Sequence, residues 1–257
     1  MYPIDLSGKK GIIFGVANDR SIAWAIASIL AQGGARLALT YQNDRLKDRV
    51  VRLASTLDEA LTLPCDATDD NQIAAVFQQV AESFGDISFL VHSIAYANRE
   101  DLSGQFSETS REGFRMALEI SAYSLIPLLK HAAPLMKDGG SVVTMTFQAS
   151  QRVYPGYNVM GTAKAALEHE VRQLAAEYGD RNIRVNAISA GPLDTLAARG
   201  IHGFLDMKRI HAQKAPLQRN ITGDEVAKAA LFLCSELSGG ITGSIIPVDA
   251  GYHIMAV

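Results

Sequence analysis

Short apolar runs alternate along this chain with longer segments in which apolar residues recur every three or four positions. The short runs are typical of buried strands, and the longer segments are typical of amphipathic helices. The predicted strands are residues 11–14, 36–41, 60–63, 87–92, 140–146, 184–188 and 245–248. The predicted helices are residues 21–32, 44–54, 70–84, 108–137, 161–178 and 222–235. This alternation predicts an α/β fold, a doubly wound parallel sheet of about seven strands with helices on both faces.

A single domain accounts for residues 1–257, because no repeat, low-complexity tract or change of composition divides them. That length is ordinary for one doubly wound unit. Thr222 and Glu225 have the spacing of a capping box at the start of the last predicted helix. Residues 191–216 are less regular, since they open with Gly-Pro and contain Gly200 and Gly203. A plain surface excursion is one interpretation of that stretch.

Composition and charge exclude several classes of function. Hydrophobic residues make up 48% of the chain and charged residues 20%, which suits a large core under a polar surface. The net charge is −3 and no basic block occurs, so a nucleic-acid or anionic-membrane partner is not expected. No apolar run reaches the ~20 residues that span a bilayer, and the N-terminus lacks a signal-peptide pattern. Cys65 and Cys234 are far apart, so we expect buried free thiols, no metal site and a cytoplasmic protein.

Tyr157 and Lys164 are the first candidates for chemistry. They are seven positions apart, and that spacing brings both side chains to one side of a helix. A lysine there can hold ribose hydroxyls, and its charge favours the phenolate-like character that a proton-donating tyrosine needs. The alternative is an ordinary pair of surface residues.

A second candidate is the glycine turn after the first predicted strand. Gly15 would let a pyrophosphate approach the backbone, and the free N–H groups at the start of the next helix would bind its charge. The spacing G-x-G-x-x-G is absent, because Gly15 is the one glycine between Gly11 and Gly33. A plain turn, with Ser21 as an ordinary N-cap, is the alternative.

Together these segments resemble a known family. Gly15, Ser21 and Ala23 fit Gly-x5-Ser-x-Ala, and Tyr157 and Lys164 fit Tyr-x6-Lys. Both spacings are similar to those of the divergent branch of the short-chain dehydrogenases/reductases, which contains the bacterial enoyl-acyl carrier protein reductases. The likeness continues through Thr40-Tyr-Gln-Asn-Asp, Cys65-Asp, His92-Ser-Ile-Ala, Asn186-Ala-Ile-Ser-Ala-Gly-Pro, Thr195-Leu-Ala-Ala and Val248-Asp-Ala-Gly-Tyr. It implies a Rossmann-type domain that binds a nicotinamide dinucleotide.

The resemblance also implies which residues hold the cofactor. They are Gly15, Ser21, Ile22, Gln42, Asp66, Ala67, Ile94, Lys164, Leu193, Thr195 and Ala197. At the adenosine end, Gln42 is neither the acid typical of an NAD site nor the arginine of an NADP site. The family points to NADH, while the nearby Arg45 leaves NADPH open. Asp66 as a turn cap, and Thr195 as the cap of a short helix after a Gly-Pro turn, are the structural alternatives.

The implied reaction is the reduction of a trans-2-enoyl thioester. Tyr157 would hydrogen-bond the thioester oxygen where negative charge develops, and Lys164 would bind the nicotinamide ribose. The residues expected to contact the substrate are Ala97, Phe147, Tyr157, Met160, Phe204 and Met207. Residues 191–216 would form the flap over it. Core packing is the alternative role of Met160.

Three departures from the family pattern leave the substrate open. Phe147 stands where most members have a second tyrosine, and Asp194 stands where they have a basic residue. The flap carries His202, Leu205 and Asp206 where relatives present basic residues to acyl carrier protein. The thioester would therefore be carried on acyl carrier protein or on coenzyme A. A paralogue reducing another activated C=C or C=O group, or a non-catalytic dinucleotide-binding protein, are the alternatives.

By the same resemblance the chain is expected to form a homotetramer, through its long helices and through the apolar segment 248–257.

Overall fold

A seven-stranded sheet, parallel throughout, forms the centre of the computed structural model, which describes residues 4–195, 197–201 and 203–256. Its strands are β1 (Lys10–Phe14), β2 (Arg36–Tyr41), β3 (Leu61–Pro64), β4 (Phe89–His92), β5 (Gly140–Thr146), β6 (Ile183–Ala190) and β7 (Ile245–Val248). They lie in the order β3-β2-β1-β4-β5-β6-β7. Successive strands are added outward on one side of β1 up to β3 and on the other side from β4, so the strand order reverses between β1 and β4. The predicted doubly wound α/β fold is confirmed.

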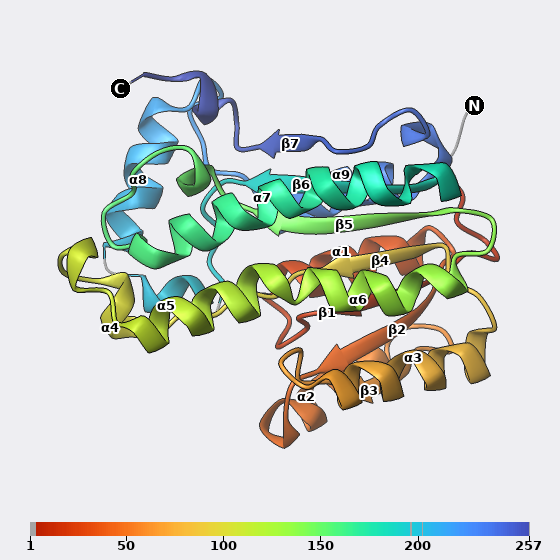
Figure 1. The fold of residues 1–257 in the computed structure, drawn as a ribbon. Coiled ribbons are helices and arrows are strands. Elements are labelled where there is room, and N and C mark those ends of the chain that lie inside the picture. The colour runs from red at the N-terminus through yellow and green to blue at the C-terminus, as the bar shows by residue number, and fades with distance from the viewer. Residues whose placement is uncertain (1–3, 196, 202, 257) are drawn as a thin grey trace.

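Helices cover both faces of the sheet (Figure 1). One apolar cluster joins the sheet to α1 (Ile22–Gln32), α2 (Asp44–Ala54) and α9 (Gly223–Cys234). The other joins it to α3 (Asp70–Phe84), α6 (Leu125–Ala132) and α7 (Asn158–Tyr178). The remaining α-helices of the described residues, α4 (Arg99–Leu102), α5 (Arg111–Leu118) and α8 (Phe204–Lys214), lie at the end of the molecule to which the strands point. Three helices therefore lie near the carboxyl ends of the strands.

The long helix predicted over residues 108–137 is interrupted. Asp101 accepts a hydrogen bond from Ser110 N (2.8 Å), and Ser110 caps α5 through Gly113 N (2.9 Å). A wider π-type turn, Glu119–Tyr123, then separates α5 from α6. In that turn Ser121 Oγ bonds both the N–H and the carbonyl of Tyr96, which draws the helix toward the loop after β4. Apolar periodicity alone does not reveal such a widening.

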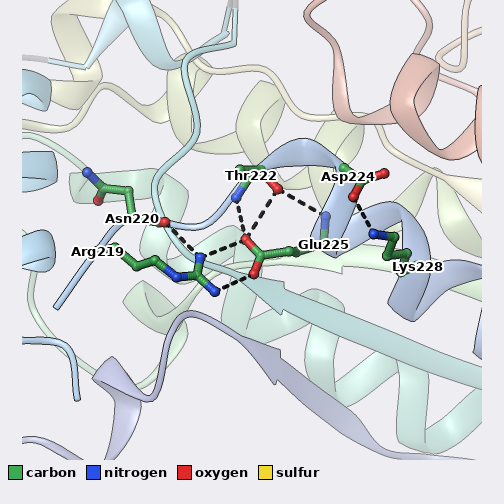
Figure 2. A network of polar contacts seen from close by, with 6 residues as sticks. All are labelled: Arg219, Asn220, Thr222, Asp224, Glu225 and Lys228. Carbon is green, nitrogen blue, oxygen red and sulfur yellow. Dashed lines mark hydrogen bonds and ion pairs between the residues drawn. The ribbon is translucent and has the colours of Figure 1, made fainter. Parts of the chain in front are cut away.

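The predicted capping box at the start of α9 is confirmed, and an arginine reinforces it (Figure 2). Thr222 Oγ1 accepts from Glu225 N (3.3 Å), and Glu225 Oε2 accepts from Thr222 N (2.9 Å). Arg219 donates to both carboxylate oxygens of Glu225, at 3.0 and 2.6 Å. These bonds lower the pKa of Glu225 to about 2. The chain that leaves α8 is thus fixed before α9 begins.

Both cysteines are buried and unpaired, as predicted. Burial raises the pKa of Cys65 and of Cys234 to about 12. Within the described residues no helix is both long and apolar enough to cross a bilayer. Nor do these residues include a group of three or more His, Cys, Asp or Glu side chains placed to bind a metal ion.

Candidate active site

The predicted site residues form a row along the carboxyl edge of the sheet. Ligands of open α/β sheets bind at this edge, where the strand order reverses, and here that point lies between β1 and β4. In spatial order the row is Asp66 after β3, Gln42 after β2, Gly15 after β1, Ile94 after β4, Phe147 after β5 and Leu193 after β6. Residues expected at the adenosine lie at one end of the row, and those expected at the substrate lie near the other.

Gly15 occupies the narrowest point of this row. Its φ is +98°, and a Cβ atom built on it would lie 2.0 Å from the carbonyl oxygen of Ser93 at the end of β4. Any side chain here would force the two strand ends apart. The glycine therefore keeps the backbone close at the switch point, where a dinucleotide would pass.

The start of α1, which follows the Gly15 turn in the sequence, presents unbonded amides. The N–H groups of Ile22 and Ala23 have no hydrogen-bond partner among the described residues. Ser21 occupies the N-cap position, but its hydroxyl does not cap the helix and donates instead to Asn18 O (2.6 Å). Free amides at a helix N-terminus bind phosphate oxygens. The arrangement fits a pyrophosphate.

At the adenosine end, Asp66 makes a turn contact. Its Oδ1 accepts from Thr68 N (3.0 Å) and from Thr68 Oγ1 (2.8 Å), while Asp69 caps α3. The turn-capping alternative is therefore observed, and it uses one of the two carboxylate oxygens. Gln42 is exposed and Ala67 is partly buried.

Tyr157 lies at the head of α7 among aromatic and apolar side chains. It is the N-cap residue (φ −113°, ψ −20°), so α7 begins three residues earlier than predicted. The centroid of its ring is 5.1 Å from that of Phe147. Ala97, Met160 and Tyr157 belong to one apolar cluster that also contains Leu102, Leu118 and Ala163. The structure thus brings four of the predicted substrate residues together.

The pKa values of the two predicted catalytic residues, Tyr157 and Lys164, are shifted in opposite directions. Burial raises the pKa of Tyr157 above its ordinary value of 10.0, and the charge of Lys164, which was expected to favour phenolate-like character, does not offset that rise, so the phenol keeps its proton. Lys164 is buried, and its Nζ donates to the carbonyl oxygen of Met145 (2.8 Å). Burial lowers the pKa of Lys164 to about 8, and the charge of Glu168 opposes that shift. A protonated phenol is a hydrogen-bond donor, which suits an oxygen that gains negative charge.

Residues 191–216 fold into a short helix, η6 (Ala197–Gly200), and into α8. Thr195 Oγ1 accepts from Ala198 N (3.2 Å), so the helix-capping alternative for this threonine is observed. Leu193 packs on the core. His202 and the side chain of Ala197 lie outside the described residues.

Ion pairs neutralise the acids of this stretch. Asp194 is exposed and pairs with Lys208 Nζ (2.5 Å), and Asp206 pairs with Arg209 (3.2 Å). Phe204 is buried and Met207 partly exposed, and neither belongs to the cluster around Tyr157 as far as the described residues show.

Two buried polar residues near the site were not predicted. Glu168 lies one turn after Lys164 on α7, and that spacing was the available signal. His211 lies on α8 with its ring 4.8 Å from that of Tyr252. The sequence carries no local signal for this second contact, because the two residues are on separate elements.

Comparisons with known proteins agree with this geometry. A family model described as Enoyl-(Acyl carrier protein) reductase matches residues 15–253. The chain is 48% identical to the NADH-dependent enoyl-acyl-carrier-protein reductase of Nostoc sp. over 99% of its own length and 100% of the relative. The enzyme of that name from Bacillus subtilis is also 48% identical, over 98% of both chains.

Solved structures give the same result. The Bacillus cereus enoyl-acyl carrier protein reductase with NADP+ and indole naphthyridinone superposes with a TM-score of 0.96 at 47% identity, over 98% of this chain and 99% of that one. The reductase of Anaplasma phagocytophilum in complex with NAD gives a TM-score of 0.95 at 44% identity, over 98% and 96% of the two chains.

Proposed function

This chain belongs to the enoyl-(acyl carrier protein) reductase family, and on that premise we propose how its residues act on a trans-2-enoyl thioester in fatty-acid elongation. It is an NADH-dependent oxidoreductase. Bound NADH supplies the hydride that adds to the β-carbon. Gly15, the amides of Ile22 and Ala23, and the loops after β2 and β3 form the part of the carboxyl edge of the sheet that is suited to the adenosine diphosphate.

Tyr157 acts as the hydrogen-bond donor to the thioester oxygen. When the β-carbon is reduced, negative charge collects on that oxygen, and a donor placed there stabilises the transition state more than the ground state. The half-buried phenol is protonated at neutral pH, because burial raises its pKa. Carbon 2 of the resulting enolate is then protonated from solvent or through a relay.

Lys164 binds the nicotinamide ribose and places positive charge under the reacting groups. Its ammonium has three N–H donors, and Met145 O accepts one of them. The other two have no partner among the described residues and are available to ribose hydroxyls. The observation that carries the proposal is this juxtaposition: Tyr157 against Phe147 at the end of β5, with Lys164 bonded to Met145 two residues earlier in that segment.

The acyl chain lies along Ala97, Phe147 and Met160, with Phe204 and Met207 of the flap over it. Phe147 contributes an apolar wall and no hydroxyl, so Tyr157 is the donor in this pair of rings. Relatives are named for acyl carrier protein, which supports a carrier-protein thioester as the substrate. The paired charges of Asp194 and Lys208 weaken the flap as a docking surface for an acidic carrier, so coenzyme A thioesters belong in the same test.

The assembly is a homotetramer in this proposal. Apolar side chains exposed on the single chain support it, since contact with other copies would remove them from water. They include Phe114, Tyr123 and Ile126 on the α5–α6 segment and Ile254 and Met255 in the C-terminal segment. Two buried, unpaired thiols are compatible with a reducing compartment, so the proposal extends to the cytoplasm.

Turnover of defined substrates tests the function. Purified protein is mixed with NADH or NADPH and with crotonyl thioesters of acyl carrier protein and of coenzyme A, and the absorbance of the reduced nicotinamide is followed. Faster loss with NADH and the carrier-protein substrate is expected. Binding of NADH without turnover of either thioester would overturn the proposed activity.

A further inference from the structure

Glu168 is a buried acid of α7 to which the mechanism above gives no role. Its side chain is 3% exposed. One carboxylate oxygen, Oε1, accepts hydrogen bonds from Thr146 Oγ1 (2.8 Å) and from Ser150 Oγ (2.6 Å). A buried carboxylate is costly unless it is bonded and near positive charge, so its position calls for a compensating group.

Lys164 is the positive charge on the same helix face; among the described residues no ion pair joins it to Glu168 directly, so the two charges act on each other through space. Lys164 lies four residues before Glu168, which is one helical turn, and it is 4% exposed. The lysine bonds Met145 O on β5, and the glutamate bonds the hydroxyls of Thr146 and Ser150. These three contacts bracket Phe147, the ring that faces Tyr157.

Close packing fixes the same stretch of backbone. A Cβ atom on Gly161 of α7 would lie 2.8 Å from the carbonyl oxygen of Ala149. Helix α7 therefore holds residues 145–150 at both ends by hydrogen bonds and in the middle by direct contact. These contacts restrain the backbone on both sides of Phe147 relative to Lys164.

Glu168 is also the acid whose charge acts on Lys164. Burial lowers the pKa of Lys164 to about 8, and the glutamate is the group that opposes this shift. The other ionisable group that interacts with the lysine is His92 on β4, whose ring is hydrogen-bonded to Thr144 and Ser124; burial lowers the pKa of His92 to about 3, so it is neutral.

The acids and bases of α4, α5 and α6 are paired, exposed or stacked on other side chains. Asp101 of α4 is bonded by Ser110, and Arg115 and Glu119 pair with each other. On α6, Lys130 is exposed and the ring of His131 stacks on Phe77.

We propose that Glu168 is a positioning residue of the reductase site, which keeps Lys164 protonated and holds the Phe147 wall against Tyr157. The proposal rests on the function proposed above for Lys164. Without the buried negative charge, a larger share of Lys164 loses its proton near neutral pH. The site then loses the positive charge on which ribose binding and stabilisation of the enolate depend.

Glu168→Gln separates charge from shape. The amide oxygen still accepts from Thr146 and Ser150, while the negative charge is gone. The titration of Lys164 is followed by NMR in the ligand-free protein labelled at the lysine Cε, and its signal is assigned from its absence in Lys164→Arg. The midpoint, near pH 8 in the parent, is expected to fall by about one pH unit or more. An unchanged midpoint would overturn the proposal, whatever the enzyme reduces.

Catalysis gives the second readout. The alkaline limb of the kcat/KM profile is expected to move to lower pH in Glu168→Gln by the same amount as the NMR midpoint. Glu177→Gln, an exposed change on the same helix, is the matched control and leaves both values in place. If the midpoint moves and the limb does not, Glu168 tunes Lys164 but Lys164 is not used in turnover, and the proposed function fails instead.

Two further variants guard against a general loss of structure. Ser150→Ala removes one hydroxyl contact and keeps the charge, so it should raise KM for the thioester and leave the Lys164 midpoint near that of the parent. Glu168→Asp retains the charge one methylene farther away and should give a midpoint between those of the parent and Glu168→Gln. A shift in Ser150→Ala as large as that of Glu168→Gln would make the effect structural and contradict the electrostatic role.

Discussion

The polar groups beneath Tyr157 and those beneath the flap are both buried, yet they are held in different ways. Around α7 and β5, Lys164 and Glu168 each have hydrogen-bond partners at 2.6–2.8 Å. Under α8, both ring nitrogens of His211 and the side-chain oxygen of Asn220 are buried and have no partner among the described residues. Buried polar groups are costly when unpaired, so the first region is fixed by short hydrogen bonds, whereas the second is held mainly by packing.

Packing does define the second region. The His211 ring lies against Tyr252, and a Cβ atom on Gly191 would lie 3.0 Å from His211 Nε2. Gly191, where the flap begins, therefore lies against the His211 ring of α8. We expect substitutions beneath Tyr157 to affect chemistry strongly and substitutions under the flap to affect stability modestly.

Tyr157→Phe tests the fixed region most directly. Turnover of the enoyl thioester should fall by about 10²–10⁴-fold, because the oxygen that gains charge loses its donor. The affinity for NADH should hardly change, since the ring keeps its contacts with Phe147 and Met160. Steady-state kinetics with calorimetric NADH titration measures both. Unaltered turnover would remove Tyr157 from the mechanism.

Lys164→Ala is expected to have the next largest effect. The loss of a charged donor to the ribose should weaken NADH binding by roughly tenfold to a hundredfold, which corresponds to about 1.5–3 kcal/mol. Lys130→Ala, an exposed change on α6, is the control and should bind NADH as the parent does. Native affinity in Lys164→Ala by calorimetry would show that the ribose contact is wrong.

His211→Leu should stabilise the protein, in contrast to both changes above. Removing two unpartnered ring nitrogens from the interior should raise the free energy of unfolding by about 1 kcal/mol. Burial also lowers the pKa of His211, so the unfolded chain takes up a proton before the folded one does. Stability is therefore present above the ordinary histidine value of about 6.5 and is lost as the pH falls through the lower folded value.

Urea denaturation at roughly pH 5 and pH 8 checks this prediction, and the gain should be larger at the lower pH. His169→Gln, an exposed change on α7, should shift stability by no more than about 0.5 kcal/mol at either pH. A loss of stability in His211→Leu would mean that the ring nitrogens are bonded in solution, and the contrast between the two regions would disappear.

Lys208→Gln should give the smallest effect. Its partner Asp194 has a side chain that is 65% exposed, and exposed ion pairs contribute about 0–1 kcal/mol. The free energy of unfolding, measured in urea, should therefore change by less than about 1 kcal/mol. Lys214→Gln, on the same helix, is the control. A larger loss would indicate that this pair anchors the flap.

Much of the fold follows from sequence because buried parallel strands and capped helices carry local signals. The predicted bounds of β2, β5, β7, α2 and α3 coincide with the observed ones. The row of loops that carries Gly15, Ile94 and Phe147 also follows, because parallel strands end at one edge. The π-type turn at Glu119–Tyr123 does not, since hydroxyl contacts with a distant loop produce it.

The sequence predicted those site residues whose chemistry follows from their type and spacing. It did not predict those whose role depends on neighbours in the folded chain. Tyr157 and Lys164 are identified by their spacing, whereas the pKa of each is set by burial that only the folded chain shows. In the sequence Glu168 is one acid among others on a helix. Its role becomes visible only in the folded chain, where Thr146 and Ser150 donate hydrogen bonds to it. His211 likewise gains meaning only from Gly191 and Tyr252.

The two cysteines make this protein convenient for site-directed labelling. The thiolate is the form that reacts with maleimides. Both native thiols are buried and have a raised pKa, so they should not react. A Leu205→Cys variant would place a thiol on α8 at a side chain that is 78% exposed. A fluorophore or spin probe attached there would report the surroundings of α8 in the otherwise native sequence, before and after addition of NADH.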